Sequence, residues 1–471
     1  MKFVILILCT LALTACGGGG SNNSVVTPVV TPVVTNATVN PKILSQNLSP
    51  ATTDLVDYPT PGGYDYSTAF FAFGKFGSAN ANCMLTQSIA RGTLGAALPT
   101  YPDAPIYVVC QQADGSFQEV SNQLFGQLLY ATGAYPLVAD FNNDGIDDVF
   151  IIQSWDGYAV DGTLNTKKIY GLISKSDGTY SVNNVSIPAG YTGQTQTTAM
   201  DINQDGCLDV VGSSNRVWLG DCAGGFSLSM MSGNIDGINW FTGTGMCAAD
   251  FNNTGAKQFV VTDEKFTAKT NNIYEVDKNL NVTAVHPLPT PYFDTVYGTN
   301  ATHNFKCITA DINNDGKIDV IVFTRPWAQF TNNSWTSQSY VQVYLNQGNW
   351  QFQDISATAL PGYNTNTASS YSARLIDVNG DGYLDIALEG TSFSGVSASG
   401  NQIWINNKDS TFTKVFTTEL ATLDALIPNG AHGINSMLPI KVNNTWNYIV
   451  GEQDPSSHYH ILLANTQFTF K

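Results

Sequence analysis

Charged residues are scarce in this sequence, and basic residues are scarcer still. Asp, Glu, Lys and Arg make up 12% of the 471 residues, and 20 basic residues against 37 acidic ones give a formal net charge of -17. Because a protein needs a basic face to bind the phosphates of a nucleic acid, this balance excludes nucleic acid as the expected partner. The hydrophobic share of 43% excludes wholesale disorder. Low charge together with many Gly, Asn, Thr and aromatic residues is typical of an extracytoplasmic β protein.

The amino terminus lacks an apolar run long enough to span a membrane as a helix. The run Phe3–Leu13, which follows Lys2, is too short for that but suits the core of a signal peptide. It ends in Leu-Thr-Ala-Cys16, which resembles the lipobox of bacterial lipoproteins. This resemblance implies that residues 1–15 are a lipoprotein signal peptide and that Cys16 is lipidated and anchors the chain to a membrane. A plain secreted signal peptide is the alternative.

The residue after Cys16 and the segment that follows refine this expectation. Gly17 stands where Asp would mark inner-membrane retention, so the resemblance implies the outer membrane of a Gram-negative bacterium, in a surface-exposed or periplasm-facing orientation. Residues 16–50 then form the lipidated Cys and a low-complexity tether of Gly, Ser, Asn and Val-Val-Thr-Pro repeats. About 34 residues of coil span about 30–35 Å, which would hold a folded domain at residues 51–471 clear of the lipid headgroups.

One nine-residue pattern recurs five times in that domain. Four copies follow D-x-N-x-D-G-x-x-D, and one copy departs from the pattern at Thr254 and Gln258. The copies are Asp140–Asp148, Asp201–Asp209, Asp250–Gln258, Asp311–Asp319 and Asp377–Asp385. Repetition on this scale indicates a fold that is built from repeated units.

The spacing of oxygen-bearing residues within the copies predicts calcium binding. Side-chain oxygens at positions one, three and five, a backbone carbonyl at position seven and a carboxylate at position nine can surround one hard cation, and Gly at position six permits the sharp turn. We expect about four structural calcium ions. The predicted ligands are Asp140, Asn142, Asp144, Ile146, Asp148, Asp201, Asn203, Asp205, Cys207, Asp209, Asp311, Asn313, Asp315, Lys317, Asp319, Asp377, Asn379, Asp381, Tyr383 and Asp385.

Two other types of loop carry similar residues. An EF-hand is excluded because it needs Glu at position twelve, where this chain has Ile151, Gly212, Val322 and Leu388. Polar turns held by Asx hydrogen bonds alone remain the alternative to bound calcium. The copy Asp250–Gln258 lacks the carboxylates at positions five and nine, so we expect it to bind no ion or to bind one weakly.

The segments around the copies predict the fold. Short apolar runs flank each copy, and an apolar strand, a polar turn and a return strand that usually carries an aromatic residue follow downstream. Hairpins of this kind also occur without the nine-residue copy at residues 106–117 and 459–468, which makes seven units of four strands. The copies resemble the FG-GAP or VCBS repeat of integrin alpha-subunit propellers and bacterial surface proteins. The resemblance implies an all-β, seven-bladed β-propeller with calcium-binding loops between the first and second strands of its blades.

The cysteines predict disulfides. Of 8 cysteines, an even number remains once Cys9 is cleaved off and Cys16 is lipidated, which suggests pairing in an oxidising compartment. Free buried thiols are the alternative. A loop and a turn on one face of a single unit favour one pair, and first strands of adjacent units favour a second. The predicted pairs are Cys207 with Cys222, Cys247 with Cys307 and, from the remainder, Cys83 with Cys110.

Catalytic motifs are absent from the sequence. It contains no H-E-x-x-H, no G-x-S-x-G and no phosphate-cradling Gly-rich loop, and for His458 and His460 we expect a surface or packing role. Propellers bind ligands on the face opposite to these nine-residue copies. Long connections predicted on that face carry the candidate ligand-binding residues Trp155, Tyr158, Trp240, Arg325 and Trp327, with packing of loop against loop as the alternative.

These observations favour a binding or adhesion module for a glycan or a protein partner. The alternative is an extracellular polysaccharide-active enzyme, a lyase or hydrolase, with its site on the same face. A structural factor of the cell envelope is a third possibility.

Overall fold

The computed structural model describes residues 43–58, 64–92, 104–131, 134–153, 168–187, 197–212, 215–233, 245–262, 271–298, 301–326, 340–361, 370–390, 402–415, 433–442, 445–453 and 459–470. The chain divides into two units, Met1–Asn40 and Pro41–Lys471, and every described residue belongs to the second. The predicted signal peptide and Cys16 therefore lie outside the described residues. No helix in these ranges is long and apolar enough to cross a membrane.

Five antiparallel sheets of four strands follow one another along the chain, each built from strands in consecutive order. Strands such as β8, in which every residue is buried and the four central residues are apolar, supply their packed faces. The strands are β7 Ala134–Ala139, β8 Asp148–Gln153, β9 Ile169–Ser174 and β10 Tyr180–Asn184; β11 Thr198–Met200, β12 Asp209–Val211, β13 Arg216–Gly220 and β14 Phe226–Met230; β15 Met246–Ala249, β16 Gln258–Val261, β17 Asn272–Val276 and β18 Val282–Pro287; β19 Thr302–Ala310, β20 Asp319–Pro326, β21 Tyr340–Gly348 and β22 Gln351–Asp354; and β23 Ser370–Ile376, β24 Asp385–Gly390, β25 Gln402–Asn406 and β26 Phe412–Val415.

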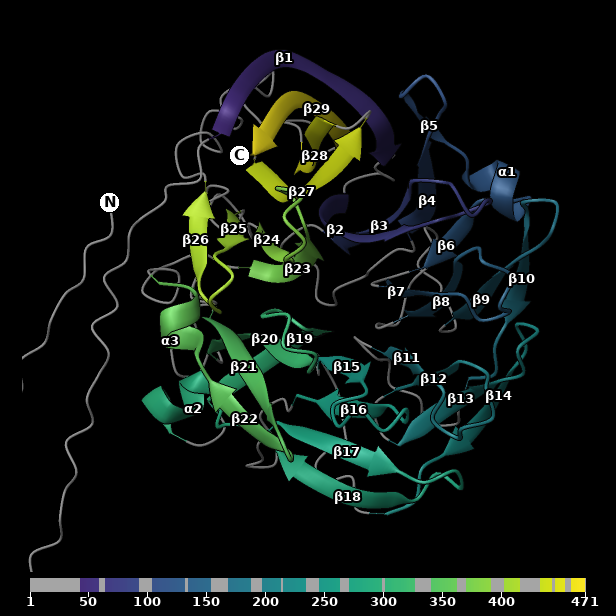
Figure 1. Ribbon diagram of the computed structural model, residues 1–471. Helices are drawn as coiled ribbons and strands as arrows, with labels where there is room; N and C mark the ends of the chain where they lie inside the picture. Colours follow the sequence, from purple (N-terminus) through teal and green to yellow (C-terminus); the bar gives the residue numbers. More distant parts are fainter. Residues whose placement is uncertain are drawn as a thin grey trace, which may run out of the picture. The chain divides into compact units, whose positions relative to one another are not determined.

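A sixth four-stranded sheet joins the two ends of the unit. It has the order β1-β29-β28-β27, with β27 Gly433–Val442, β28 Thr445–Gln453, β29 Tyr459–Phe470 and β1 Ile43–Tyr58. β1 begins within the stretch expected to be tether and pairs antiparallel with β29, so that Ile43 lies opposite Phe470 and Tyr58 opposite Tyr459. A strand from the amino-terminal part of the unit thus completes the sheet formed by its carboxy-terminal strands (Figure 1).

The remaining sheet has five strands. It contains β2 Tyr64–Gly74, β3 Cys83–Gly92, β4 Ala104–Gln111, β5 Phe117–Glu119 and β6 Leu129–Ala131. β5 pairs with the last residues of β4, and β6 pairs with its first residues. The helix α1 Ser121–Phe125 lies between them, and the Ser121 hydroxyl accepts the Val108 N–H of β4 at 2.7 Å. The fourth strand of this sheet is therefore split by a helical turn.

The prediction of seven four-stranded blades is thus wrong. The described residues form six blades of that kind, and the sheet β2–β6 differs because α1 buries Leu124 and Phe125 and interrupts its outer strand. The other short helices, α2 Tyr292–Tyr297 and α3 Ser356–Ala359, follow the fourth strands of their sheets. They leave those strands intact.

The first strands of successive sheets contact one another around a closed ring, except that the second strand of the sheet β23–β26 makes the contact with β27. β2 contacts β7, and the contacts continue through β11, β15, β19 and β23; β24 then contacts β27, which contacts β2 again (Figure 1). This closed arrangement of antiparallel sheets is a β-propeller.

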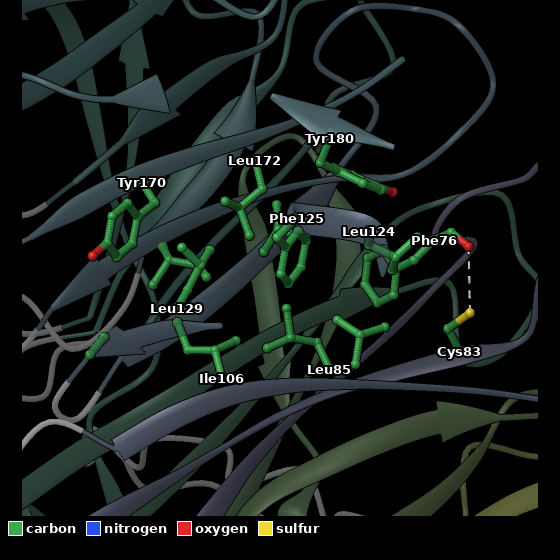
Figure 2. Packing of buried hydrophobic residues seen from close by; sticks show 14 of the residues in the cluster. Phe76, Cys83, Leu85, Ile106, Leu124, Phe125, Leu129, Tyr170, Leu172 and Tyr180 are labelled. Atoms are coloured by element: carbon green, nitrogen blue, oxygen red, sulfur yellow. Dashed lines mark hydrogen bonds between the residues drawn. The ribbon is translucent and has the colours of Figure 1, made fainter. Parts of the chain in front are cut away.

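Hydrophobic clusters fill the spaces between neighbouring sheets. Figure 2 shows the cluster between the sheet β2–β6 and the sheet β7–β10, where Leu85 and Ile106 face Leu172. Phe125 of α1 meets the ring of Tyr180 edge to face at 5.7 Å. Burial of this kind contributes roughly 25 cal/mol per Å² of apolar surface, so the contact between sheets is a main source of stability.

Candidate functional site

The nine-residue copies form loops that join the first and second strands of five sheets, as predicted. In each of the four copies with the full pattern, the backbone N–H of position five donates hydrogen bonds to two side-chain oxygens. In the loop Asp140–Asp148, the N–H of Asp144 donates to Asp140 Oδ1 at 3.1 Å and to Asn142 Oδ1 at 3.2 Å. The other three loops make the same two bonds. Oxygens of positions one and three therefore converge on one point.

Glycine at position six makes this turn possible. Gly145 has a φ of 85°, in the left-handed region that favours glycine, and its N–H donates to Asp140 Oδ2 at 2.9 Å. The same bond recurs at Gly206, Gly316 and Gly382. Position one thus accepts hydrogen bonds on both of its oxygens.

The carboxylates at position nine are buried and turned toward the backbone. Asp319 is 0% exposed, and its Oδ2 accepts the N–H of Ile312 at 3.0 Å while its Oδ1 accepts the N–H of Asn346 at 2.8 Å. Burial raises the pKa of Asp319 to about 7, against these hydrogen bonds, which lower it. Burial likewise raises the pKa of Asp209 and Asp385 to about 6 and raises the pKa of Asp148. These side chains fasten the loop to the third strand of its own sheet.

The loop Asp250–Gln258 reaches the same shape with neutral side chains at positions five and nine. Gln258 Oε1 accepts the N–H of Phe251 at 2.9 Å, the role that Asp plays elsewhere, and Gln258 Nε2 donates to Asn252 Oδ1 at 3.3 Å. Thr254 Oγ1 also donates to Asn252 Oδ1, at 2.7 Å. The oxygen at position three is therefore occupied by internal donors.

Each loop also reaches into the neighbouring sheet. The residue at position two is buried in all five loops, and Phe141 packs edge to face on Phe226 of the following sheet at 5.2 Å. Asn346 Nδ2 donates to Phe251 O of the preceding loop at 2.9 Å, and Asn406 Nδ2 donates to Ile312 O at 2.7 Å. In the closing sheet, Trp446 Nε1 donates to Val378 O at 2.8 Å. The loops therefore hold neighbouring sheets together, a role that the sequence analysis did not predict.

The donor set can be compared with the needs of a calcium ion. Within the described ranges, no group of three or more His, Cys, Asp or Glu side chains is arranged to hold a metal ion. In each of the four full copies, the carboxylates at positions one and five are partly or fully exposed, and the third, at position nine, is buried against backbone N–H groups. Two carboxylates and one amide oxygen form an oxygen-only set of the type that calcium prefers.

The disulfides join the cysteines in the pairs that the sequence predicted. Cys207–Cys222 links position seven of a loop to the β13–β14 turn of the same sheet. Cys247–Cys307 links the first strands β15 and β19 of adjacent sheets across 60 residues. The third pair, Cys83–Cys110, joins β3 to β4.

The predicted ligand face falls mostly outside the described ranges. Trp155, Tyr158, Trp240 and Trp327 lie outside them, and Arg325 is placed only by its backbone near the end of β20, opposite His303 of β19. The structure thus leaves that part of the prediction untested. It does fix the strand ends that carry the connections: β8 ends at Gln153 and β9 begins at Ile169, and β20 ends at Pro326 and β21 begins at Tyr340.

Comparison with curated protein sequences found no match. Among solved structures, an Agrocybe aegerita lectin studied for recognition of non-reducing terminal N-acetylglucosamine is 13% identical, with a TM-score of 0.43 over 88% of this chain and 94% of the lectin. The exotype rhamnogalacturonan lyase YesX is 14% identical, with a TM-score of 0.42 over 87% of this chain and 75% of the lyase. A rhamnogalacturonan lyase of Bacillus licheniformis is 12% identical, with a TM-score of 0.41 over 88% and 74%. These low values carry no conclusion about function.

A family comparison matches the sequence more specifically. Residues 311–388 match the FG-GAP-like repeat, and this stretch contains two of the nine-residue loops and the strands β20 to β23. The chain therefore carries an FG-GAP-like repeat and folds as a β-propeller.

Proposed function

We propose that this protein is a lipid-anchored outer-membrane lipoprotein whose propeller binds a glycan. The observation that carries the proposal is the division of the sheets into two ends. Because the strands alternate in direction, the nine-residue loops and the turns between third and fourth strands lie at one end, which we call the loop end. The long connections, such as residues 154–168 and 327–339, start and finish at the other end, which we call the open end.

Long connections on a rigid scaffold are the usual place for binding residues. The connections at the open end carry Trp155, Trp240 and Trp327, and aromatic rings beside Asn and Asp suit stacking on sugar rings. The closed ring of sheets supplies the rigidity, since hydrogen bonds and packed aromatic rings hold each sheet to the next. Recognition of a glycan at the open end is the function that this arrangement supports best.

Calcium would serve the loop end. Asp, Asn and Asp at positions one, three and five of the loops 140–148, 201–209, 311–319 and 377–385 would hold it, and the ion would neutralise the surface carboxylates of each loop. Its role is structural. Because every loop touches the neighbouring sheet, an ion that fixes the loop also fixes the contact between sheets.

A glycan array tests the proposed ligand. The mature chain with Cys16→Ser is applied in calcium, and we expect binding that is lost in Trp240→Ala with Trp327→Ala. Trp350→Ala is the matched control, since Trp350 lies at the loop end in the β21–β22 turn, and it should bind as the parent does. Binding that survives the double substitution would contradict the proposal, as would capture of proteins but no glycan. Cleavage of a bound polymer would show that the protein is an enzyme and would contradict a function limited to binding.

A further inference from the structure

The path of the first strand, β1, determines where the amino-terminal segment enters the propeller. Trp446, at the start of β28, donates its indole N–H to Val378 O in the loop Asp377–Asp385 at 2.8 Å. The start of β28 therefore lies at the loop end. Trp446 is paired with Phe468 of β29, so the last residues of β29 lie at that end too.

β1 starts at the same place. It runs antiparallel to β29, and its residue Ile43 is the partner of Phe470. The other end of β1, Tyr58, is the partner of Tyr459, where β29 begins at the open end. The chain preceding Ile43 therefore joins the propeller at the loop end, on the side opposite to the long connections.

We propose that the propeller stands on the membrane with its nine-residue loops toward the lipid and its open end facing away. This inference rests on the lipid anchor of the proposed function. Residues 17–42, if they form the predicted coil, span about 25–30 Å, so the loop end is held within that reach of the headgroups. To turn the open end toward the lipid, the tether would have to extend by a further typical strand length of about 17–20 Å, at a cost in coil entropy.

The orientation separates two surfaces with different partners. The loop end carries surface carboxylates and the proposed calcium, close to the headgroups. The open end carries the long connections and meets a soluble or cell-surface glycan without obstruction by the bilayer. A propeller anchored in this way presents its binding residues outward without any change in fold.

Energy transfer from single labels to the membrane tests the orientation. The mature chain, with a hexahistidine sequence in place of Cys16 and the whole tether retained, is bound to vesicles that contain nickel-chelating lipid and an acceptor dye. Two donor positions flank β10, Ser176→Cys in the preceding turn and Ile187→Cys beyond its end. Two more flank β18, Lys278→Cys in the preceding turn and Val296→Cys on α2. All four side chains are exposed.

The expected result is higher transfer from the loop-end member of each pair, Ser176→Cys and Lys278→Cys. Only variants that melt at the parent temperature are compared. Because the two pairs lie in different sheets, a tilt of the propeller on the membrane cannot by itself raise transfer from the loop-end label in both pairs. Equal transfer within both pairs, or higher transfer from the open-end labels, overturns the orientation. Absence of lipid on Cys16, measured by mass spectrometry of the native protein, would instead refute the lipid anchor of the proposed function. It would leave the result of the energy-transfer experiment unchanged.

Discussion

Replacement of Asn406 by Ala is expected to weaken the contact between two sheets. Asn406 is 2% exposed at the end of β25. Its Nδ2 donates to Ile312 O of the preceding loop at 2.7 Å and to Leu384 O of its own loop at 3.1 Å. Its Oδ1 accepts the N–H of Lys408 at 2.9 Å. Ala would remove all of these bonds and leave the buried carbonyl of Ile312 and the partly buried carbonyl of Leu384 without this donor.

The magnitude follows from the hydrogen bonds that are lost. A hydrogen bond contributes about 1 kcal/mol net, and a buried group left without a partner costs about 1–3 kcal/mol, so the loss of stability is about 4 kcal/mol. The entropy of unfolding is about 2.1 cal/mol/K per residue, which for the roughly 430 residues of the unit Pro41–Lys471 gives about 0.9 kcal/mol/K. The melting temperature should therefore fall by about 4 °C.

Differential scanning calorimetry of the parent and the variant in calcium measures the shift. Asn407→Ala is the matched control, because Asn407 is the same residue type, is adjacent in sequence and is exposed. Among the described residues, its side chain bonds within its own hairpin, to Thr411 and Thr413, so the control should shift by less than about 1 °C. Equal shifts in the two variants would refute the conclusion that Asn406 joins two sheets.

Further changes probe the loops and their neighbours. In chelator, the melting temperature should rise as the pH falls from about 8 to about 5. The pKa of Asp319 is about 7 in the folded state and about 3.9 in the unfolded state, so the folded state binds more protons over this range and is stabilised as the pH falls. A melting temperature that falls with the pH would contradict this. Cys247→Ser with Cys307→Ser removes a cross-link over 60 residues and should cost about 4 kcal/mol in urea unfolding, and a loss below about 1 kcal/mol would count against it. Gly220→Ala places a Cβ against the backbone oxygen of Leu208 and should lower stability by more than about 2 kcal/mol, whereas an unchanged circular dichroism melt would show that the backbone yields.

Local patterns in the sequence predicted much of the fold and the loops. In a copy such as Asp311–Asp319, the pattern of Asp, Asn and Gly lies within nine residues, and the hydrogen bonds of these residues are also local. The disulfide pairs followed from the placement of cysteines on equivalent strands and turns. Such features depend on the order of strands and not on distant contacts, which is why the sequence indicates them.

Distant contacts set the features that the sequence did not predict. The split outer strand of the sheet β2–β6 depends on α1, a helix of 5 residues that is too short to form without the burial of Leu124 and Phe125. The pairing of β1 with β29 joins the two ends of the unit and has no local signal in a polar segment that contains Pro50. Asn346 and Asn406 both follow the apolar residues of a third strand, near the end of that strand, and this repeated position was the signal for their contacts between sheets.

The loop Asp250–Gln258, which has neutral side chains at positions five and nine, offers a way to separate two roles of the other loops. One role is the contact between sheets, and the other is the proposed binding of calcium. Copying it into the loop Asp140–Asp148, by Asp144→Thr with Asp148→Gln, keeps an acceptor for the N–H of Phe141 and removes two carboxylates. It also removes Asp148 Oδ1, which accepts the N–H of Ser174 at 2.7 Å. In chelator the melting temperature should change little, because removal of a buried carboxylate whose pKa is raised by burial offsets the hydrogen bond that the N–H of Ser174 loses. In calcium the variant should lose its share of the stabilisation, about 2.7 kcal/mol for a site at 100 times its Kd. Paired melts in chelator and in calcium measure both effects. A large loss of stability in chelator would mean that the carboxylates themselves hold the loop, and an undiminished gain from calcium would mean that the ion does not bind there.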